Sequence, residues 1–153
     1  YPNFIGTVQI FVNKFLANQA CFEKYGTYIK KNDDELYELT NAFGSPYHSL
    51  EQNAAFLANH VGCNKLCITM GEHGAMFYDN GTAHYHGGYR VKVADTVGSG
   101  DNFLAGFIYK LMNNAPAHET LSFACALGAM VAGHHGANPE ISLQDIQEFM
   151  YPA

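Results

Sequence analysis

The sequence has no tryptophan and little charge: 8 Lys and Arg stand against 14 Asp and Glu, and 14% of its 153 residues are charged. No basic run occurs in this chain of net charge −6, so we expect no nucleic-acid partner. No apolar stretch approaches the roughly 20 residues that a membrane-spanning helix needs. No signal peptide is visible, so we expect a cytoplasmic protein without a membrane partner.

Cysteine is also scarce, with Cys21, Cys63, Cys67 and Cys125 as the whole set. The spacing of Cys63 and Cys67 matches no common zinc pattern, and no histidine pair stands beside Cys or carboxylate residues at ligand spacing. We therefore expect free thiols and no structural metal site. The chain does not begin with Met and its opening resembles the interior of a longer protein, but its length suffices for one core. We interpret residues 1–153 as a single domain.

Helical patterns alternate with short apolar strands along the chain, which predicts an α/β layered sheet. A hairpin signal at Asp79-Asn80-Gly81 makes the sheet mixed at one side. The helical stripes place Phe43 and Leu143 among the inward side chains. The predicted helices cover residues 8–18, 32–43, 49–61, 104–112, 117–133 and 141–150, and the predicted strands cover 27–31, 65–69, 75–78, 82–86 and a short apolar segment from Val93.

The most distinctive turn is Gly98-Ser99-Gly100-Asp101, just before the helix that contains Leu104. Its glycines let the backbone bend and let a ligand approach closely. The first N–H groups of a helix have no partner inside it, so such an end binds phosphate or a developing oxyanion. A carboxylate at that point has a function if it takes a proton from a nucleophile that attacks the bound phosphate. The alternative is structural: Asp101 is the N-cap of the helix.

A longer stretch around this turn carries a family resemblance. Residues 95–101, followed by Phe103 and Gly106-Phe107, resemble the signature of the ribokinase-like (PfkB) carbohydrate kinases. The resemblance implies a layered α/β/α sandwich with a mostly parallel sheet. It also implies that Asp101 is the catalytic base and that the small residues before it form the anion hole for the transferred phosphoryl group; these are Gly98, Ser99 and Gly100.

The segment Asn32-Asp33-Asp34-Glu35 has two compatible interpretations. By itself it is a capping box, with Asn32 as N-cap and Glu35 three residues later. By resemblance it is the Asn-x-x-Glu motif with which the family organises water around Mg²⁺ and phosphate, and Mg²⁺ usually keeps several waters.

The segment from Thr69 to Gly74 also has two interpretations. By itself it is a tight turn between two strands of a hairpin. The family uses this turn to support the phosphates of ATP, which implicates Thr69, Gly71 and Gly74.

The resemblance implies two further binding regions. The loop over residues 133–140 resembles the adenine-binding rim, which implicates Gly136 and Asn138, although Gly136 by itself indicates a helix C-cap. Asp95 and Val97 offer oxygens to a monovalent cation such as K⁺. Glu140 departs from the family here, because relatives often have a hydroxyl residue in its place.

The resemblance covers most of the chain from Tyr28 onward, and the N-terminal half and lid of the family have no counterpart in it. Missing strands would expose one side of the sheet, so we expect self-association. The implied activity is ATP-dependent phosphorylation of a sugar hydroxyl, with a fructokinase-like substrate and Mg²⁺. Two alternatives stay open: an inactive or non-catalytic nucleotide-binding module, and an unrelated phosphate-binding domain whose three motifs do not meet.

Overall fold

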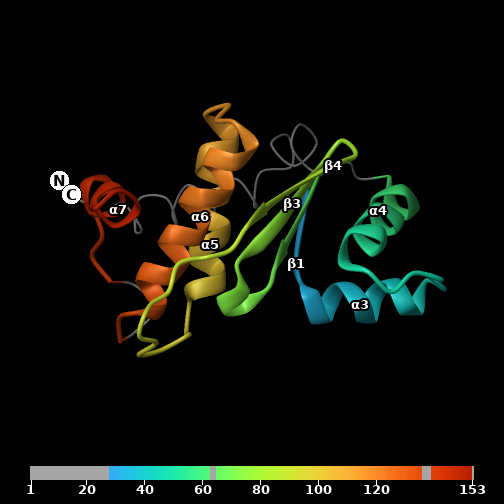
Figure 1. Ribbon diagram of the computed structural model, residues 1–153, viewed down its shortest axis with the longest axis horizontal. Helices are drawn as coiled ribbons and strands as arrows, with labels where there is room; N and C mark the ends of the chain where they lie inside the picture. The colour runs from blue at the N-terminus through green and yellow to red at the C-terminus, as the bar shows by residue number, and fades with distance from the viewer. Residues whose placement is uncertain (1–27, 63–64, 136–138, 153) are drawn as a thin grey trace, which may run out of the picture.

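The computed structural model describes residues 28–62, 65–135 and 139–152 (Figure 1). The helix predicted over residues 8–18 lies outside this part of the chain. No helix among the described residues combines the length and apolar character that crossing a bilayer requires. The elements, in order, are β1 (Tyr28–Asn32), α3 (Asp33–Ala42), α4 (Leu50–Val61), β2 (Lys65–Thr69), the 3₁₀ helix η1 (Gly71–His73), β3 (Ala75–Asp79), β4 (Thr82–His86), α5 (Ser99–Met112), α6 (Ala117–Ala132) and α7 (Leu143–Met150).

The four strands form one sheet in the order β1-β2-β3-β4. Strands β1 and β2 are parallel because α3 and α4 carry the chain back to the same edge. Strands β2, β3 and β4 are antiparallel, and the predicted hairpin between β3 and β4 is confirmed, with positive φ at Asn80 (48°) and Gly81 (91°). The described sheet is therefore mixed, and its parallel pairing is β1–β2.

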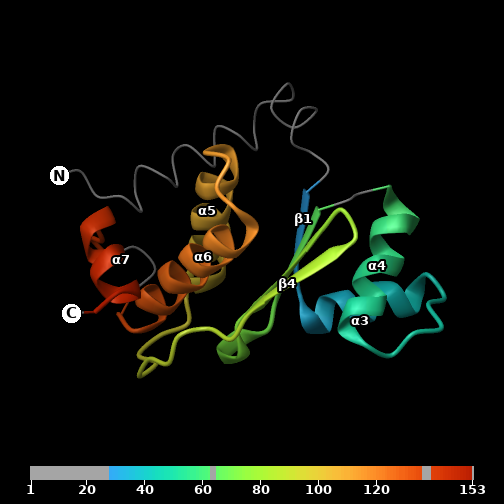
Figure 2. The same cartoon turned by 45° about the horizontal axis from the view of Figure 1, so that its top comes forward.

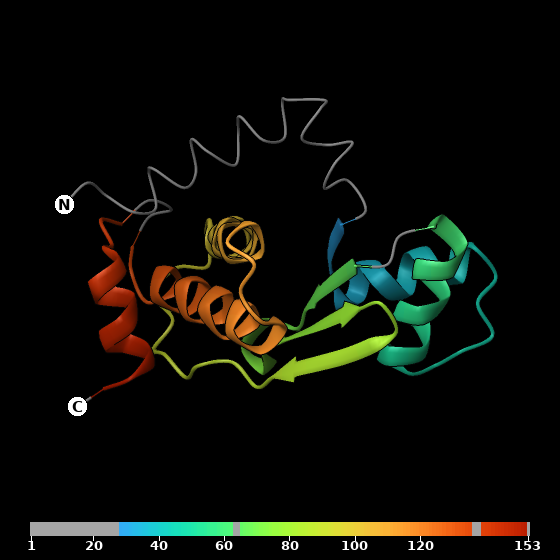
Figure 3. The ribbon, with the colours of Figure 1, turned by 90° about the horizontal axis from the view of Figure 1, so that it is seen from above.

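Side chains on β2 and β3 alternate between the two faces of the sheet, as a strand requires. Leu66, Ile68 and Met76 belong to the core cluster beneath α3 and α4. Cys67 and Phe77 belong to a second cluster that they share with α5 and α6. Figure 3 shows these helix pairs on opposite sides of the sheet. The layered α/β/α arrangement predicted from the sequence is confirmed.

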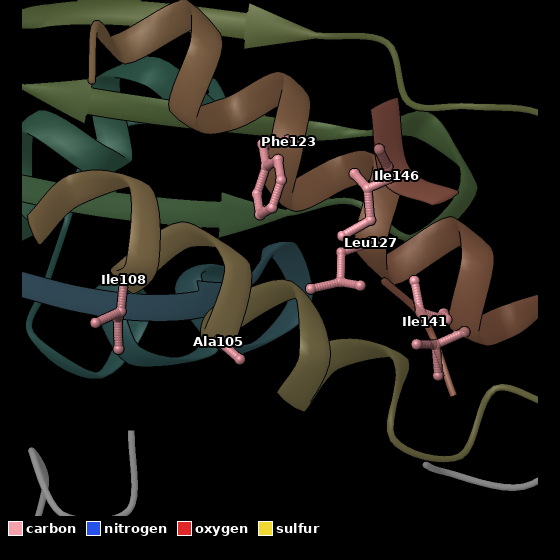
Figure 4. Packing of buried hydrophobic residues seen from close by; sticks show 8 residues of the cluster. Ala105, Ile108, Phe123, Leu127, Ile141 and Ile146 are labelled. Carbon is pink, nitrogen blue, oxygen red and sulfur yellow. The ribbon is translucent and has the colours of Figure 1, made fainter. Parts of the chain in front are cut away.

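Helices α5 and α6 pack closely because small residues line their contact. A methyl group on Gly106 of α5 would lie 3.1 Å from the Leu127 side chain of α6. A methyl group on Gly128 of α6 would lie 3.4 Å from both the Phe103 side chain and the Ser99 carbonyl oxygen of α5. Figure 4 shows how this contact continues to α7, where Ile146 packs in the same buried cluster as Leu127. The small residues of α6 thus serve helix packing.

Three expectations about local structure are wrong. No strand forms from Val93, because the N–H groups of Ala94 and Asp95 donate to the Ala132 carbonyl at the end of α6 instead of to a strand. Phe43 lies just beyond α3 as its C-cap, 40% exposed, with its ring stacked on His60. Leu143 opens α7 and is 44% exposed, since only later turns of that helix meet the core.

The two described cysteines, Cys67 and Cys125, are buried and form no disulfide, which agrees with the predicted thiols. Burial raises the pKa of the Cys125 thiol to about 12, so this thiol stays protonated near neutral pH. Cys67 lies on β2 within the cluster shared with α5 and α6.

Candidate active site

The first turn of α5 is built from Gly98, which is the N-cap with left-handed backbone (φ 79°) and offers no side chain to cap the helix. The backbone N–H and the side-chain amide of Asn102 donate to the Gly98 carbonyl, at 2.9 and 2.8 Å. The Ser99 N–H donates to the Thr96 carbonyl at 3.2 Å. Among the described residues, the Gly100 N–H donates a hydrogen bond to no acceptor. The turn therefore leaves part of the helix N-terminus open to an anion.

Asp101 is not the N-cap of α5, so that alternative is wrong. It is the third residue of the helix, after Ser99 and Gly100, because Gly98 takes the capping position. Its side chain is exposed and accepts no hydrogen bond from any described residue. A carboxylate in this state is accessible to a hydroxyl group from a bound molecule.

The capping box at the start of α3 is confirmed. The Asn32 side chain accepts a hydrogen bond from the Glu35 N–H at 2.7 Å, and the Glu35 carboxylate accepts one from the Asn32 N–H at 3.0 Å. Both residues are exposed. One oxygen of Glu35 caps the helix, and the other has no hydrogen-bond partner among the described residues.

The turn after β2 requires glycine at Gly74. The Met70 N–H donates to the Gly74 carbonyl at 2.8 Å and closes the turn around η1. Gly74 has φ 91° and ψ −137°, and a methyl group on it would overlap the His86 carbonyl and lie 2.6 Å from the Gly88 nitrogen. Gly71 also has positive φ (57°), but no atom lies within 4 Å of the position a methyl group would take. Gly71 thus faces open space, whereas Gly74 lies against the backbone of residues 86–88.

The three motifs meet at one edge of the sheet. Strand register pairs Asn32 at the end of β1 with Thr69 at the end of β2. Phe103 in the first turns of α5 shares a core cluster with Ala75, the residue after Gly74. In Figures 1 and 2 the start of α3, η1 and the start of α5 all lie along the lower edge of the molecule. This convergence disfavours an unrelated domain with scattered motifs.

Of the other predicted site residues, the structure describes Asp95 and Val97. One Asp95 carboxylate oxygen accepts a hydrogen bond from the Val97 N–H at 2.9 Å, and the Val97 side chain is 58% exposed. Gly136 and Asn138 lie outside the described residues. Helix α6 already ends at Gly133, whose N–H donates to the Ala129 carbonyl, so Gly136 is not its C-cap.

Two features were missed by the sequence interpretation. A cavity of about 400 Å³ lies between α3 and the segment before α4, lined by residues that include Tyr37, Tyr47 and His48. It contains none of the predicted site residues. The second feature is the contact of Gly74 with residues 86–88, which the Gly87-Gly88 pair could have signalled.

Comparison with known proteins agrees with this geometry. The family model of the pfkB family carbohydrate kinases matches residues 4–143. Fructokinase-2 of Solanum lycopersicum is 32% identical over 123 residues, which cover 74% of this chain and 35% of the fructokinase. Aminoimidazole riboside kinase of Salmonella typhimurium is 31% identical over 121 residues, which cover 76% of this chain and 36% of that kinase. The chain belongs to the pfkB carbohydrate kinase family.

Solved structures agree on the fold. Ribokinase from Thermotoga maritima superposes with a TM-score of 0.71 at 22% identity, over 80% of this chain and 41% of the ribokinase. Arabidopsis thaliana ribokinase, solved with ribose and ATP, superposes with a TM-score of 0.70 at 23% identity, over 82% of this chain and 41% of that chain. The chain spans about a third of the length of the curated relatives it matches.

Replacing Gly71 and Gly74 by alanine, one at a time, will show which of the two positions tolerates a side chain. Gly71→Ala adds a side chain at positive φ in open space and should cost about 1–2 kcal/mol of unfolding free energy. Gly74→Ala also adds a side chain at positive φ and in addition a clash with three backbone atoms, so its loss should be clearly larger. Urea unfolding of both variants measures this. Equal losses would contradict the wedged position of Gly74.

Proposed function

We propose that this chain is the catalytic, nucleotide-binding part of a kinase that phosphorylates a sugar hydroxyl with ATP. The observation that carries the proposal is the exposed Asp101 carboxylate beside the open N-terminus of α5, at the edge where two further motifs lie. The identity to tomato fructokinase-2 supports a fructokinase-like substrate. We place the protein in the cytoplasm, with no membrane or nucleic-acid partner.

In this proposal Asp101 is the general base. The sugar hydroxyl oxygen bonds to the γ-phosphorus of ATP while the bond from that phosphorus to the β-γ bridging oxygen breaks, and ADP leaves with the electron pair. Asp101 takes the hydroxyl proton, a contribution of about 10²–10⁴-fold in rate for a positioned base. The positive end of α5, at Gly98, Ser99 and Gly100, stabilises charge on the moving phosphoryl group.

The start of α3 fits a metal held through water. Asn32 and Glu35 are exposed, and the second Glu35 oxygen is available to accept a hydrogen bond from a coordinated water. Mg²⁺ bound there would offset negative charge on the β- and γ-phosphates. Thr69, Gly71 and Gly74 would support those phosphates from the neighbouring strand end.

The remaining residues are assigned by family position. Gly136 and Asn138 would line the adenine rim. Asp95 and Val97 would contribute oxygens to a K⁺ site, for which the second Asp95 oxygen is the free one. The outer edge of β1 pairs with no described strand, which supports self-association of this chain.

The second candidate function is a non-catalytic nucleotide-binding module. It is favoured by the span of the chain, which covers 35% of tomato fructokinase-2. Activity assays of the 153-residue chain with ATP and fructose or ribose test this second candidate. We expect nucleotide binding with little phosphorylation from this chain alone. Efficient sugar phosphorylation would exclude the non-catalytic module, and absence of nucleotide binding would argue against both.

Replacing Asp101 by asparagine tests the base assignment in the full-length encoded protein. Asp101→Asn keeps the shape of the side chain and removes its ability to take a proton. We expect turnover to fall by several orders of magnitude, with ATP affinity nearly kept. The matched control is Glu148→Gln, which removes a carboxylate from the exposed face of α7. Unchanged turnover in Asp101→Asn would refute the assignment.

Replacing Glu35 by glutamine separates capping from metal binding. Glutamine also serves in a capping box, so Glu35→Gln should leave the unfolding free energy nearly unchanged. Loss of the charge should raise the Mg²⁺ concentration needed for half-maximal ATP binding by about tenfold.

Glu35→Ala is the companion variant, and it should lose both stability and Mg²⁺ response. An unchanged Mg²⁺ response in both variants would leave Glu35 with the capping role alone.

A further inference from the structure

The turn over residues 71–74 is held from outside by the segment that follows β4. Gly74 packs directly on the backbone of residues 86–88. A methyl group on Gly88 would lie 3.1 Å from the Gly74 backbone and 3.2 Å from the Glu72 carbonyl, so the two segments touch backbone to backbone. The conformation of one segment therefore limits that of the other.

One side chain fixes the outer segment. The Gly88 N–H donates to Nδ1 of His86 at 2.9 Å, and Gly88 has a positive φ of 80°. An imidazole nitrogen accepts a hydrogen bond only when it carries no proton, so His86 is the neutral tautomer with its proton on Nε2. The same strand carries His84, which lies two residues earlier, has its ring near Phe77, and has no such bond.

The surroundings of His86 disfavour a positive charge. Its ring lies 6.1 Å from that of His118 on α6 and 5.0 Å from that of Tyr89. Partial burial and the repulsion from His118 lower the pKa of His86.

Among the described residues, no carboxylate forms an ion pair with His86. Glu72 and His73 on the adjoining turn face each other with side chains at least 80% exposed, and Glu119 of α6 pairs with Lys110. The β3 partner of His86 is the uncharged Ala75.

We propose that His86 is a positioning residue for the phosphate-supporting turn: its neutral imidazole holds Gly88, Gly88 holds Gly74, and protonation of His86 releases both segments. We call this chain of contacts from His86 through Gly88 to Gly74 the lock, and it rests on the contacts described above. Its consequence for nucleotide binding rests on the proposed function of residues 69–74.

The direction of the pH effect follows from proton binding. The unfolded chain binds a proton at His86 more readily than the folded chain does. The stabilisation is therefore present above the ordinary histidine pKa of about 6.5 and is lost as pH falls through the lower folded pKa. Protonation puts a hydrogen on Nδ1 opposite the Gly88 N–H, so the bond becomes a repulsive contact.

Amide NMR of the 153-residue chain between pH 8 and 5 tests the lock. As His86 protonates, the chemical shift of the Gly88 amide should change over the same pH range as the imidazole signals of His86. Hydrogen-exchange protection of the Met70 amide should fall about five- to tenfold, as for loss of one hydrogen bond. His86→Asn keeps an acceptor near the Nδ1 position without titrating, so both signals should stay constant. His86→Leu removes the acceptor and should show the acidic behaviour at every pH. His84→Asn is the matched control and should titrate like the unmodified chain.

The lock is overturned if the Gly88 and Met70 amides do not respond when His86 protonates, or if they respond equally in His86→Asn. A separate arm measures the affinity for the ATP analogue AMPPNP at pH 8 and 5.5. Because the nucleotide phosphate titrates too, the change is compared with that in His86→Asn, which should be smaller. No AMPPNP binding at pH 8 would refute the proposed function, and the amide signals would still decide the lock.

Discussion

The geometry of the candidate site depends first on how helix α5 is held against α6 and the sheet. The rings of Phe77 and Phe107 meet edge to face, with centroids 4.8 Å apart, and both are buried. Glycines at positions 106 and 128 let α6, which itself packs on β3 and β4, approach α5 closely. Since the free N–H groups of a helix point along its axis, the packing that fixes the axis also fixes where an anion binds. The position of Asp101 is therefore a consequence of core packing.

Strand register places the other two motifs. Asn32 and Thr69 are neighbours because β1 and β2 pair in one parallel register. A slip of one residue in β2 would turn Leu66 and Ile68 away from the core cluster beneath α3 and α4, which makes such a slip costly. The alternation of apolar residues that builds the core thus also brings the Asn-x-x-Glu motif beside the turn after β2.

The sequence was sufficient where local chemistry decides the structure. Helix α4 begins after Ser49 as N-cap and ends at Gly62 in the left-handed conformation, as its pattern indicates. The sequence was insufficient where contacts with residues distant along the chain determine the local structure. The apolar residues near Val93 predict a strand, but the available acceptor for the backbone is the Ala132 carbonyl.

The candidate site shows the same division. Its residues could be named from motifs, and the resemblance to the family supplied their roles. Their meeting at one edge required the fold, and so did the capping role of Gly98, which moves Asp101 to the third position of α5. The contact of Gly74 with residues 86–88 joins segments about a dozen residues apart, so the motif over residues 69–74 does not reveal it by itself. The first turn of α5 is thus fixed by buried aromatic rings, whereas the turn over residues 71–74 is fixed by backbone contacts and one titratable acceptor.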